Sequence, residues 1–390
     1  MLMLLLALAA QQPGDSLSLR AALTRARGQR PLSVATAASV AEARGVLRSA
    51  SAIPNPTVAY SHSEAFPLNH LTVEQPLDWL LRRGADRDAG RAGVARAGAD
   101  SAQAMAQLDR DVRSAYWSAR ASREASALAA TEAMEADSLA AIAGARYRAG
   151  EISLLEQEQA EQEAALSRQA ESRAREDARV SALDLARALG RSDGTVVPTD
   201  PLDSGLDQLP PGDLLPAATP AVRSAVADSV AAAAQLRATA RARVPTPSLQ
   251  AGAEWGDPSQ PGSLSTIGFA IPLPLWNQDG GGMTAARARA GRASALAAET
   301  RLEADRLILG AKVHLEETAL RARVARDSLV PSAARIRSRA MRGYAAGETG
   351  ILPALDALRS ERQVLLEAIQ DQLAFQLALA DWHALSGSDE

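Results

Sequence analysis

The sequence of 390 residues contains no cysteine. This excludes disulfide bonds, thiolate metal ligands, a cysteine nucleophile and the acceptor of an N-terminal lipid anchor. Aromatic residues make up only 3% of the chain. Alanine and arginine dominate instead, interleaved with glutamate, glutamine, leucine and serine, so most positions favour helix and few offer a bulky core group. The composition therefore predicts long helices packed through small side chains rather than ordinary globular domains.

The chain also lacks an excess of one charge and any grouping of residues typical of a catalytic site. The 42 basic and 46 acidic residues give a net charge of -4 without a block of either sign, which excludes an electrostatic footprint for nucleic acid. The four histidines do not cluster at metal-ligand spacing, and the six methionines are scattered. No Ser/His/Asp grouping, phosphate loop or H-E-x-x-H helix is present. We therefore predict no catalytic residues, no metal site and no cofactor, and we do not expect an enzyme.

Long apolar runs are absent after the first residues. No later stretch approaches 18 uncharged apolar residues, so any passage through a membrane has to use strands. Residues 1–10 are apolar but too short to span a bilayer, polar Gln11 follows at once, and small residues at Ala7 and Ala9 fit a cleavage pattern. We predict that residues 1–10 are a signal peptide. The usual basic segment is missing, which leaves an upstream start codon open, and the alternative is a hydrophobic start to a cytosolic helix.

The chain is an internal duplication. The sequence Arg-Tyr-Arg-Ala-Gly-Glu around Tyr147 recurs as Gly-Tyr-Ala-Ala-Gly-Glu around Tyr344, and the helical stretches that follow end at Gly190 and Gly387. A shift of 197 residues superimposes these positions, and this period is far longer than the roughly 20 to 50 residues of a solenoid unit. We predict repeats at 11–190 and 220–387, joined by a connector rich in proline, glycine and aspartate at 191–219. A short tail at 388–390 follows.

Each repeat has the same predicted order of elements, namely helix, hairpin, long helix, turn and helix. The first helices, about 16–51 and 220–243, stop where Pro54 and Pro245 begin Pro-x-Pro sequences. Long helices without proline are predicted at about 85–145 and 283–330, and the last helices at about 153–189 and from the second turn to 385. The first long helix would extend roughly 90 Å. That is far beyond the length of helices in compact domains.

Two hairpins are predicted, at about 57–76 and 248–273, where apolar residues alternate with small or polar ones. Their connections are expected at 66–68 and in a Gly-Asp-Pro-Ser-Gln-Pro-Gly tract at 256–262. Such alternation is typical of a membrane barrel with a wet lumen. Isolated hairpins leave their edges unpaired, and four strands are fewer than the roughly eight of the smallest barrels, so closure requires several copies.

Aromatic residues gather in and beside these hairpins, which suggests the girdles that form at membrane interfaces. The candidates for lipid-facing or girdle positions are Tyr60, Trp79, Trp255, Phe269 and Trp276. The alternative is a pair of soluble hairpins capped by aromatic side chains.

Taken together, the sequence resembles the TolC-like outer-membrane efflux channels over essentially the whole mature chain. The resemblance is carried by the duplicated Tyr-x-x-Gly turns, by the Pro-x-Pro boundaries and by the segment from Phe269 to Gly280, which is similar to the strand exit of the cation and drug exporter branch. It implies a mainly α fold with a small transmembrane β part. A homotrimer would form a 12-stranded barrel in the outer membrane of a Gram-negative-type bacterium. A periplasmic α-helical barrel would continue it, with the connector in an equatorial belt.

The resemblance also implies partners and a function. The protein would be a passive exit duct of a tripartite efflux or type I secretion system, opened at its helical tips by a periplasmic adaptor (membrane fusion) protein and an inner-membrane pump. It would contact outer membrane lipids, and its cargo would be set mostly by the pump. The alternative is a soluble periplasmic coiled-coil adaptor or scaffold, although an adaptor normally has a single helical hairpin flanked by soluble β-domains.

Two groups of site residues follow from the resemblance. The adaptor-docking tips would comprise Tyr147, Ala149, Gly150, Glu151, Tyr344, Ala346, Gly347 and Glu348, whereas the simpler interpretation is a pair of helix caps. At the pore entrance Asp356 would form a ring of three carboxylates. Pro353 stands where such channels often carry an acidic residue, and Glu156 and Glu158 would compensate. The alternative for Asp356 is a solvated position on an exposed helix face.

Overall fold

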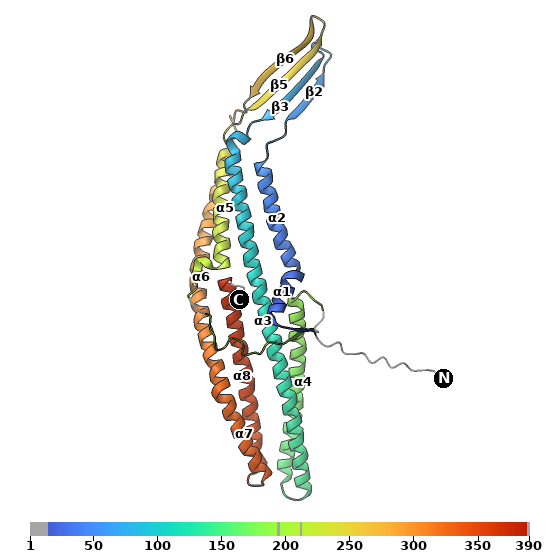
Figure 1. Cartoon of the computed structure of the whole chain (residues 1–390), viewed down its shortest axis with the longest axis vertical. Coiled ribbons are helices and arrows are strands. Elements are labelled where there is room, and N and C mark those ends of the chain that lie inside the picture. The colour runs from blue at the N-terminus through green and yellow to red at the C-terminus, as the bar shows by residue number, and fades with distance from the viewer. Residues whose placement is uncertain (1–14, 193–195, 211–212, 388–390) are drawn as a thin grey trace, which may run out of the picture. The chain divides into compact units, whose positions relative to one another are not determined.

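A computed structural model of the chain describes residues 15–192, 196–210 and 213–387. The predicted signal peptide and the tail at 388–390 lie outside these ranges. The described residues are mostly helical, and strands form two small sheets (Figure 1). Contacts divide the chain into two compact units. The first contains the described residues of Met1–Ser33, Met105–Leu214 and Arg306–Glu390, and the second contains Val34–Ala104 and Leu215–Asp305.

Among the described residues, none of the helices combines the length and the apolar character that a membrane crossing requires.

The second unit contains a four-stranded antiparallel sheet in the order β2-β3-β5-β6. Its strands are β2 (Thr57–His62), β3 (Asn69–Pro76), β5 (Ser248–Asp257) and β6 (Gln260–Ala270). The two hairpins pair through β3 and β5, with Leu71 opposite Ala253. Strands β2 and β6 each have a partner on one side only. The sheet therefore has two free edges.

The second hairpin is tighter than predicted. The tract at 256–262 was expected to be a loop, but the strands continue to the pair Asp257 and Gln260. The Asp257 carboxylate accepts hydrogen bonds from the Ser259 backbone N–H at 2.7 Å and from its hydroxyl at 2.6 Å, which closes a short turn. Gly256, at φ 91°, supplies the left-handed backbone beside it.

The register sorts the sheet into two faces. Residues that are directly opposite one another share a face, so Val58, Val73, Ala251 and Ile267 form one row across the four strands. The adjacent row on the other face contains Ala59, Thr72, Gly252 and Thr266. One face is apolar and largely exposed, with Ile267 84% exposed, and the other is small and polar.

Four helices contribute to the rest of the second unit. Helix α5 (Pro220–Ala242) belongs to it entirely, and so do most of α2 (Pro31–Ser51) and the first parts of α3 (Trp79–Arg148) and α6 (Gly280–Val324). Helices α2 and α3 approach closely at Gly90, where an added Cβ would lie 3.1 Å from the Cα atom of Leu47. Polar contacts join α3 to α5, including the ion pair of Arg96 with Asp228 at 3.0 Å. Small residues thus permit the close packing that the composition predicted.

In the first unit the start of the chain differs from the prediction. A single helix was expected over 16–51, but the structure has a strand β1 (Asp15–Leu17), a helix α1 (Leu19–Gln29) and then α2. Ser18 caps α1, and Pro31 has no N–H to continue it, so α1 ends at Gln29 with Arg30 as its C-cap and α2 begins at Pro31. Strand β1 pairs in parallel with β4 (Val196–Pro198) of the connector.

Tyr116 on α3 holds this pair of strands in place. Its buried hydroxyl accepts from the backbone N–H groups of Thr199 and Asp200, both at 3.1 Å. The Leu17 carbonyl and the Asp200 carboxylate lie 3.0 Å from the same oxygen. Burial raises the pKa of the phenol. The connector is thereby fastened to the helical core around Leu108, Val112 and Leu185.

The second long helix also departs from the prediction, which ended it near residue 330. Helix α6 passes through a π-helix (Ala325–Leu329) directly into α7 (Val330–Ala345). Pro331 has no N–H for the normal helical bond, and the π turn accommodates it because the Val330 N–H reaches back to the Ala325 carbonyl. The helix therefore continues to the second turn.

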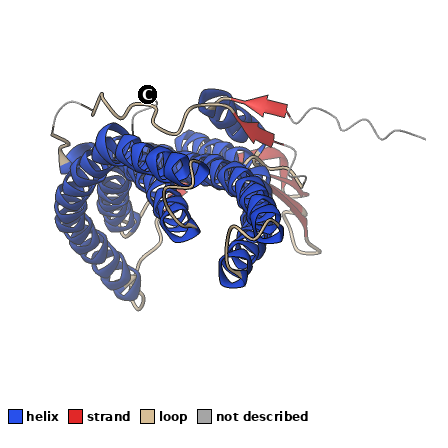
Figure 2. Cartoon of the chain, turned by 90° about the horizontal axis from the view of Figure 1, so that it is seen from below, coloured by secondary structure: helices blue, strands red, loops and turns tan. Residues whose placement is uncertain are grey.

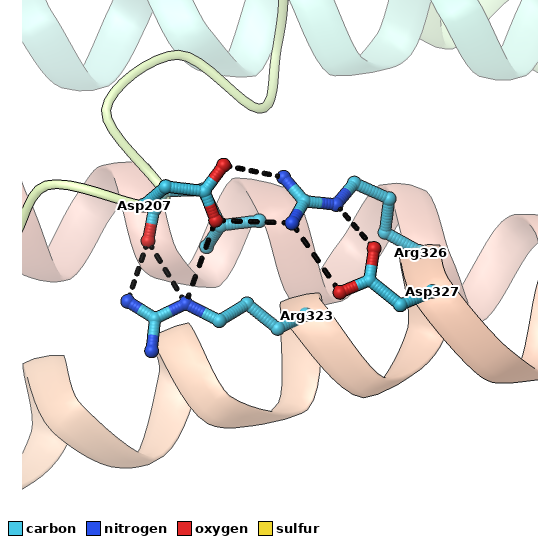
Figure 3. A network of polar contacts seen from close by, with 5 residues as sticks. Asp207, Arg323, Arg326 and Asp327 are labelled. Atoms are coloured by element: carbon cyan, nitrogen blue, oxygen red, sulfur yellow. Dashed lines mark hydrogen bonds and ion pairs between the residues drawn. The ribbon is translucent and has the colours of Figure 1, made fainter.

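A polar network anchors the connector at this π turn (Figure 3). Two N–H groups of Arg326 each bond an oxygen of Asp207 at 3.0 Å, and the same guanidinium donates to Asp327 at 2.8 Å. Arg323 donates to the Leu206 carbonyl at 2.6 and 3.0 Å. Leu206 is buried in a second core with Phe375 and neighbouring residues.

Candidate functional site at the helical tips

The duplicated Tyr-x-x-Gly sequences form two equivalent turns in the first unit. One joins α3 to α4 (Leu154–Ala188), and the other joins α7 to α8 (Ile351–Ser386) (Figure 1). The N–H of Glu151 bonds the Arg146 carbonyl, and that of Glu348 bonds the Gly343 carbonyl, each at 2.9 Å. This is the Schellman pattern that ends many helices.

The glycine of each turn has the left-handed backbone that the pattern requires. The φ angle is 76° at Gly150 and 73° at Gly347. A Cβ atom added at either position would meet no atom within 4 Å. The residues on either side, Ala149, Glu151, Ala346 and Glu348, are exposed. Both turns therefore offer a surface of small residues that no other part of the chain covers closely. Figure 2 shows the two helical hairpins from below, with their turns in tan.

The two tyrosines differ although their sequences are equivalent. Tyr147 is 40% exposed, whereas Tyr344 is 3% exposed. The guanidinium carbon of Arg146 lies 4.7 Å from the centre of the Tyr344 ring. Arg146 also donates to the carbonyls of Tyr344 at 3.1 Å and Ala345 at 3.3 Å. A cation from the first hairpin thus caps the C-terminus of α7, where a positive charge is favourable.

Glu156 makes the matching contact at the start of α8. Its carboxylate accepts from the Ser153 N–H at 3.0 Å and completes a capping box on α4. Hydrogen bonds from the backbone and hydroxyl of Ser153, and a further one from the Ile351 N–H, hold the pKa of Glu156 below its ordinary value. Gly350, the cap of α8, has no side chain to offer. The first hairpin therefore supplies an anion to the N-terminus of α8.

Apolar packing supports these polar contacts. Tyr344 and Ile351 of the second hairpin are buried in one cluster with Leu139, Ala143 and Ala160 of the first. The remaining buried members of the cluster are Ala354 and Leu355 on α8. The two tips therefore form one packed body within the first unit.

An ionic layer on the same four helices was not predicted. The side chain of Glu163 is 4% exposed and pairs with Arg359 at 2.7 Å and Arg362 at 3.4 Å. Arg337 bridges Glu135 at 2.6 Å and Glu361 at 3.0 Å. A signal was available, because Glu163 interrupts the stripe of small residues Ala160, Ala164 and Ser167 that helical spacing places on one buried face.

Glu132 belongs to this layer and has an unusual environment. Burial raises its pKa to about 7, while Arg362 acts in the opposite direction. Arg362 Nε lies 4.0 Å from a Glu132 carboxylate oxygen. Arg337 also lowers the pKa, and the carboxylates of Glu135 and Glu361 raise it. The attraction of the two arginines therefore does not offset the desolvation of this carboxyl.

The predicted entrance residues have separate environments. Asp356 has a side chain that is 74% exposed, and its recorded ion pair is with Arg359 on the same helix at 3.8 Å. Glu158 is exposed on α4. Glu156 is engaged in helix capping, as described above. The chain by itself thus presents Asp356 and Glu158 to solvent.

The predicted girdle residues lie on or beside the four-stranded sheet of the second unit. Phe269 is 75% exposed and Trp276 is 93% exposed. Tyr60 and Trp255 stack, with ring centres 6.3 Å apart. Trp79 begins α3 and is partly buried. Large aromatic and apolar groups thus remain uncovered in the single chain.

Comparisons with known proteins agree with this geometry. Residues 22–191 match the family described as outer membrane efflux protein. The chain is similar to the structure of CusC, with 18% identity, a TM-score of 0.78 and coverage of 95% of this chain and 92% of that one. No curated protein matches the sequence at a significant level.

Two further solved structures have the same fold. The outer membrane protein VceC from Vibrio cholerae has 20% identity and a TM-score of 0.75, with 95% of this chain and 97% of that chain covered. The outer membrane channel MtrE from Neisseria gonorrhoeae, in an open state, has 18% identity and a TM-score of 0.76, with 95% and 89% covered. The predicted fold class is confirmed, and these comparisons do not favour the alternative of a soluble adaptor.

Proposed function

We propose that this chain belongs to the outer membrane efflux protein family, whose members its residues 22–191 match, and that three copies form the exit duct of a tripartite efflux or type I secretion system. The observation that carries the proposal is the four-stranded sheet with two free edges and one exposed apolar face. Long free edges of this kind favour association with other strands. In a bilayer every backbone group needs a partner, so the sheet has to close.

Closure of the sheet by copies of the same chain accounts for both the two free edges and the exposed apolar face. Strand β6 of one copy would pair with β2 of the next, and three copies would supply twelve strands. The apolar face, with Val58, Val73, Ile267 and Phe269, would contact lipid, and the small polar face would line the lumen. Stacked and exposed aromatic residues such as Tyr60 and Trp255 would lie at the interfaces with the headgroups.

The tips would be the site of docking and of gating. The exposed turns at Gly150 and Gly347 suit a partner that packs closely against backbone, and we assign this role to the periplasmic adaptor. Arg146 and Glu156 hold the ends of α7 and α8 against the first hairpin. Opening of the entrance would require these contacts to separate when adaptor and inner-membrane pump engage the tips.

Asp356 would contribute to the ion selectivity of the entrance. In a trimer its exposed carboxylate would be repeated three times, and a ring of carboxylates attracts cations and repels anions. Arg359, 3.8 Å away, would reduce this effect. Glu158 would add to the negative potential from the first hairpin.

The test is a pair of variants on the last strand. Phe269→Arg would put a charge on the proposed lipid face, where the cost is about 2 to 4 kcal/mol at the bilayer midplane and less toward the headgroups, so the level of the protein in the outer membrane fraction should fall. Gly268→Ser, one residue earlier on the lumen face, should be tolerated because a Cβ there meets no atom within 4 Å. Equal membrane levels of the two variants, or a wild-type protein that stays in the periplasmic fraction without detergent, would favour the soluble scaffold instead.

A further inference from the structure

A cavity lies between the end of α2 and the start of α3 in the second unit. Its volume is about 230 Å³. Among the residues that line it are Pro54, Asp78, Trp79, Arg82, Arg83 and Asp86. None of the functions considered above uses this cavity.

Its walls carry buried nitrogen donors without partners. The indole Nε1 of Trp79 and the Nε atoms of Arg82 and Arg83 are buried and form no hydrogen bond within the described part of the chain. Buried donors without partners cost free energy, so such groups in a native protein call for a ligand or solvent. All three residues line the cavity, and donors of this kind suit the oxygens of a phosphate group, which arginine binds well.

The same cavity contains two carboxylates. Asp78 accepts a hydrogen bond from the Trp79 backbone N–H at 2.9 Å through Oδ1. Its other carboxylate oxygen has no hydrogen bond among the described residues. Burial raises the pKa of Asp86, with Arg82 acting in the opposite direction and Asp78 in the same direction. A free phosphate would therefore face two acidic groups. A ligand with both a phosphate and a cation would satisfy both the nitrogen donors and the carboxylates.

Hydrogen bonds tie the cavity to the end of the sheet. Asp78 and Trp79 follow β3 after a single residue, and the N–H of that residue, Leu77, bonds the Pro247 carbonyl at 3.0 Å. On the other wall, Gln75 of β3 donates to the Pro54 carbonyl at 3.0 Å. If the sheet crosses the outer membrane, as proposed above, the cavity lies where the strands leave the hydrocarbon core. That is the depth of lipid headgroups.

We propose that this cavity binds the headgroup of a zwitterionic phospholipid with a primary ammonium group, as in phosphatidylethanolamine. The phosphate would accept from Trp79, Arg82 and Arg83, and the ammonium would donate to Asp78 and Asp86. Exposed Ile53 and Leu80 beside the site would contact the start of the acyl chains.

The inference rests on the proposed function and is tested by lipid binding. The full-length protein, delipidated in detergent, is titrated with short-chain phosphatidylethanolamine, short-chain phosphatidylglycerol and inorganic phosphate, and bound molecules are counted by native mass spectrometry. We expect phosphatidylethanolamine to bind about tenfold more tightly than phosphatidylglycerol, and inorganic phosphate not to displace it. The double variant Arg82→Gln, Arg83→Gln should lose about tenfold or more in affinity, the range of a bond to a charged group.

Two variants and one control make the result specific. Asp86→Asn should weaken phosphatidylethanolamine but not phosphatidylglycerol, and Trp79→Phe should weaken both because it removes the N–H and keeps the ring. Arg91→Gln is the control, since Arg91 is exposed further along α3 and pairs with Asp88 at 3.1 Å. Circular dichroism checks that each variant folds.

Equal binding of the two lipids, unchanged binding in the arginine double variant, or displacement by inorganic phosphate would overturn the inference. These outcomes are separate from the proposed function. A protein that resides in the outer membrane without this lipid preference removes only the inference. A protein that binds the short-chain lipid but fractionates with soluble periplasmic proteins removes the membrane duct instead.

Discussion

The two helical tips share one sequence pattern but not one environment. Tyr147 in the first tip is 40% exposed, whereas Tyr344, its equivalent in the second tip, is 3% exposed. The residues that precede them explain this difference. Arg146 of the first tip extends over the Tyr344 ring and caps α7, and its equivalent in the second repeat is Gly343, which has no side chain to return the contact.

The first hairpin also caps the second, without a return contact, at the N-terminus of α8. Glu156 caps α4 and approaches the N-terminus of α8, and its equivalent in the second repeat is Pro353. The first hairpin thus provides a cation and an anion for the two helix ends of the second hairpin. Duplication produced two similar turns, and a few sequence differences between the repeats let the first hairpin stabilise the second. In the proposed duct, the supported hairpin is the element that would move.

The largest effect is expected from bulky side chains on the turns themselves. Gly150→Trp and Gly347→Trp should each abolish export, because they block the small-residue surface that we assign to the adaptor. Assembly should survive, since neither position has neighbours that a side chain would displace, and the backbone strain of a non-glycine residue at positive φ is on the order of 1 to 3 kcal/mol. The measurement is export in cells, with trimer and outer membrane levels as the control. Loss of assembly would show that the glycines serve only as helix caps.

The comparison of the tyrosines is tested by matched truncations. Tyr344→Ala should destabilise the helices of the first unit by about 3 kcal/mol, because it empties a buried aromatic site. Tyr147→Ala should change stability by less than about 1 kcal/mol, as expected for a partly exposed position. Thermal unfolding followed by circular dichroism in detergent compares the two. Equal losses would contradict the asymmetry of the tips.

A smaller effect is expected from pH. The pKa of Glu132 is raised to about 7 in the folded protein, above its ordinary value of 4.5. Between the ordinary pKa of 4.5 and about pH 7, Glu132 is therefore protonated in the folded protein but ionised in the unfolded chain. The unfolding free energy should consequently rise as the pH falls from about 8 to about 5.

The variant Glu132→Gln should show less of this rise, and Glu158→Gln, an exposed carboxylate on α4, should keep it. The midpoint of thermal unfolding across this pH range provides the measurement. A pH profile that is the same in all three proteins would place the responsible group elsewhere in the ionic layer between the hairpins.

The features that follow from local sequence could be predicted. The turns were predictable because a Tyr-x-x-Gly pattern at the end of an apolar helical stretch needs the positive φ that Gly150 and Gly347 provide. The alternation on the four strands also carried enough information to assign their faces, since side chains alternate with a period of two. The family resemblance then placed these elements in one architecture.

Other features depend on partners that are remote in sequence. Strands β1 and β4 have three residues each, too few to show a period, and they pair across about half the chain. Pro331 suggested a helix end, but a π turn carried the helix past it. Glu163 finds Arg359 at a separation of 196 residues, so its burial could be suspected from the small-residue stripe but its partners could not. The role of Arg146 likewise becomes visible only once both tips are packed together.

The most direct test of the account is the single-channel conductance of the full-length protein in planar bilayers. If the chain forms an outer membrane duct whose second hairpin is held by the first, the wild type should show a small conductance and Arg146→Ala a clearly larger one. Arg148→Ala, which changes an exposed arginine of the same tip, should behave like the wild type. Absence of channels, or identical conductance in the wild type and Arg146→Ala, would contradict it.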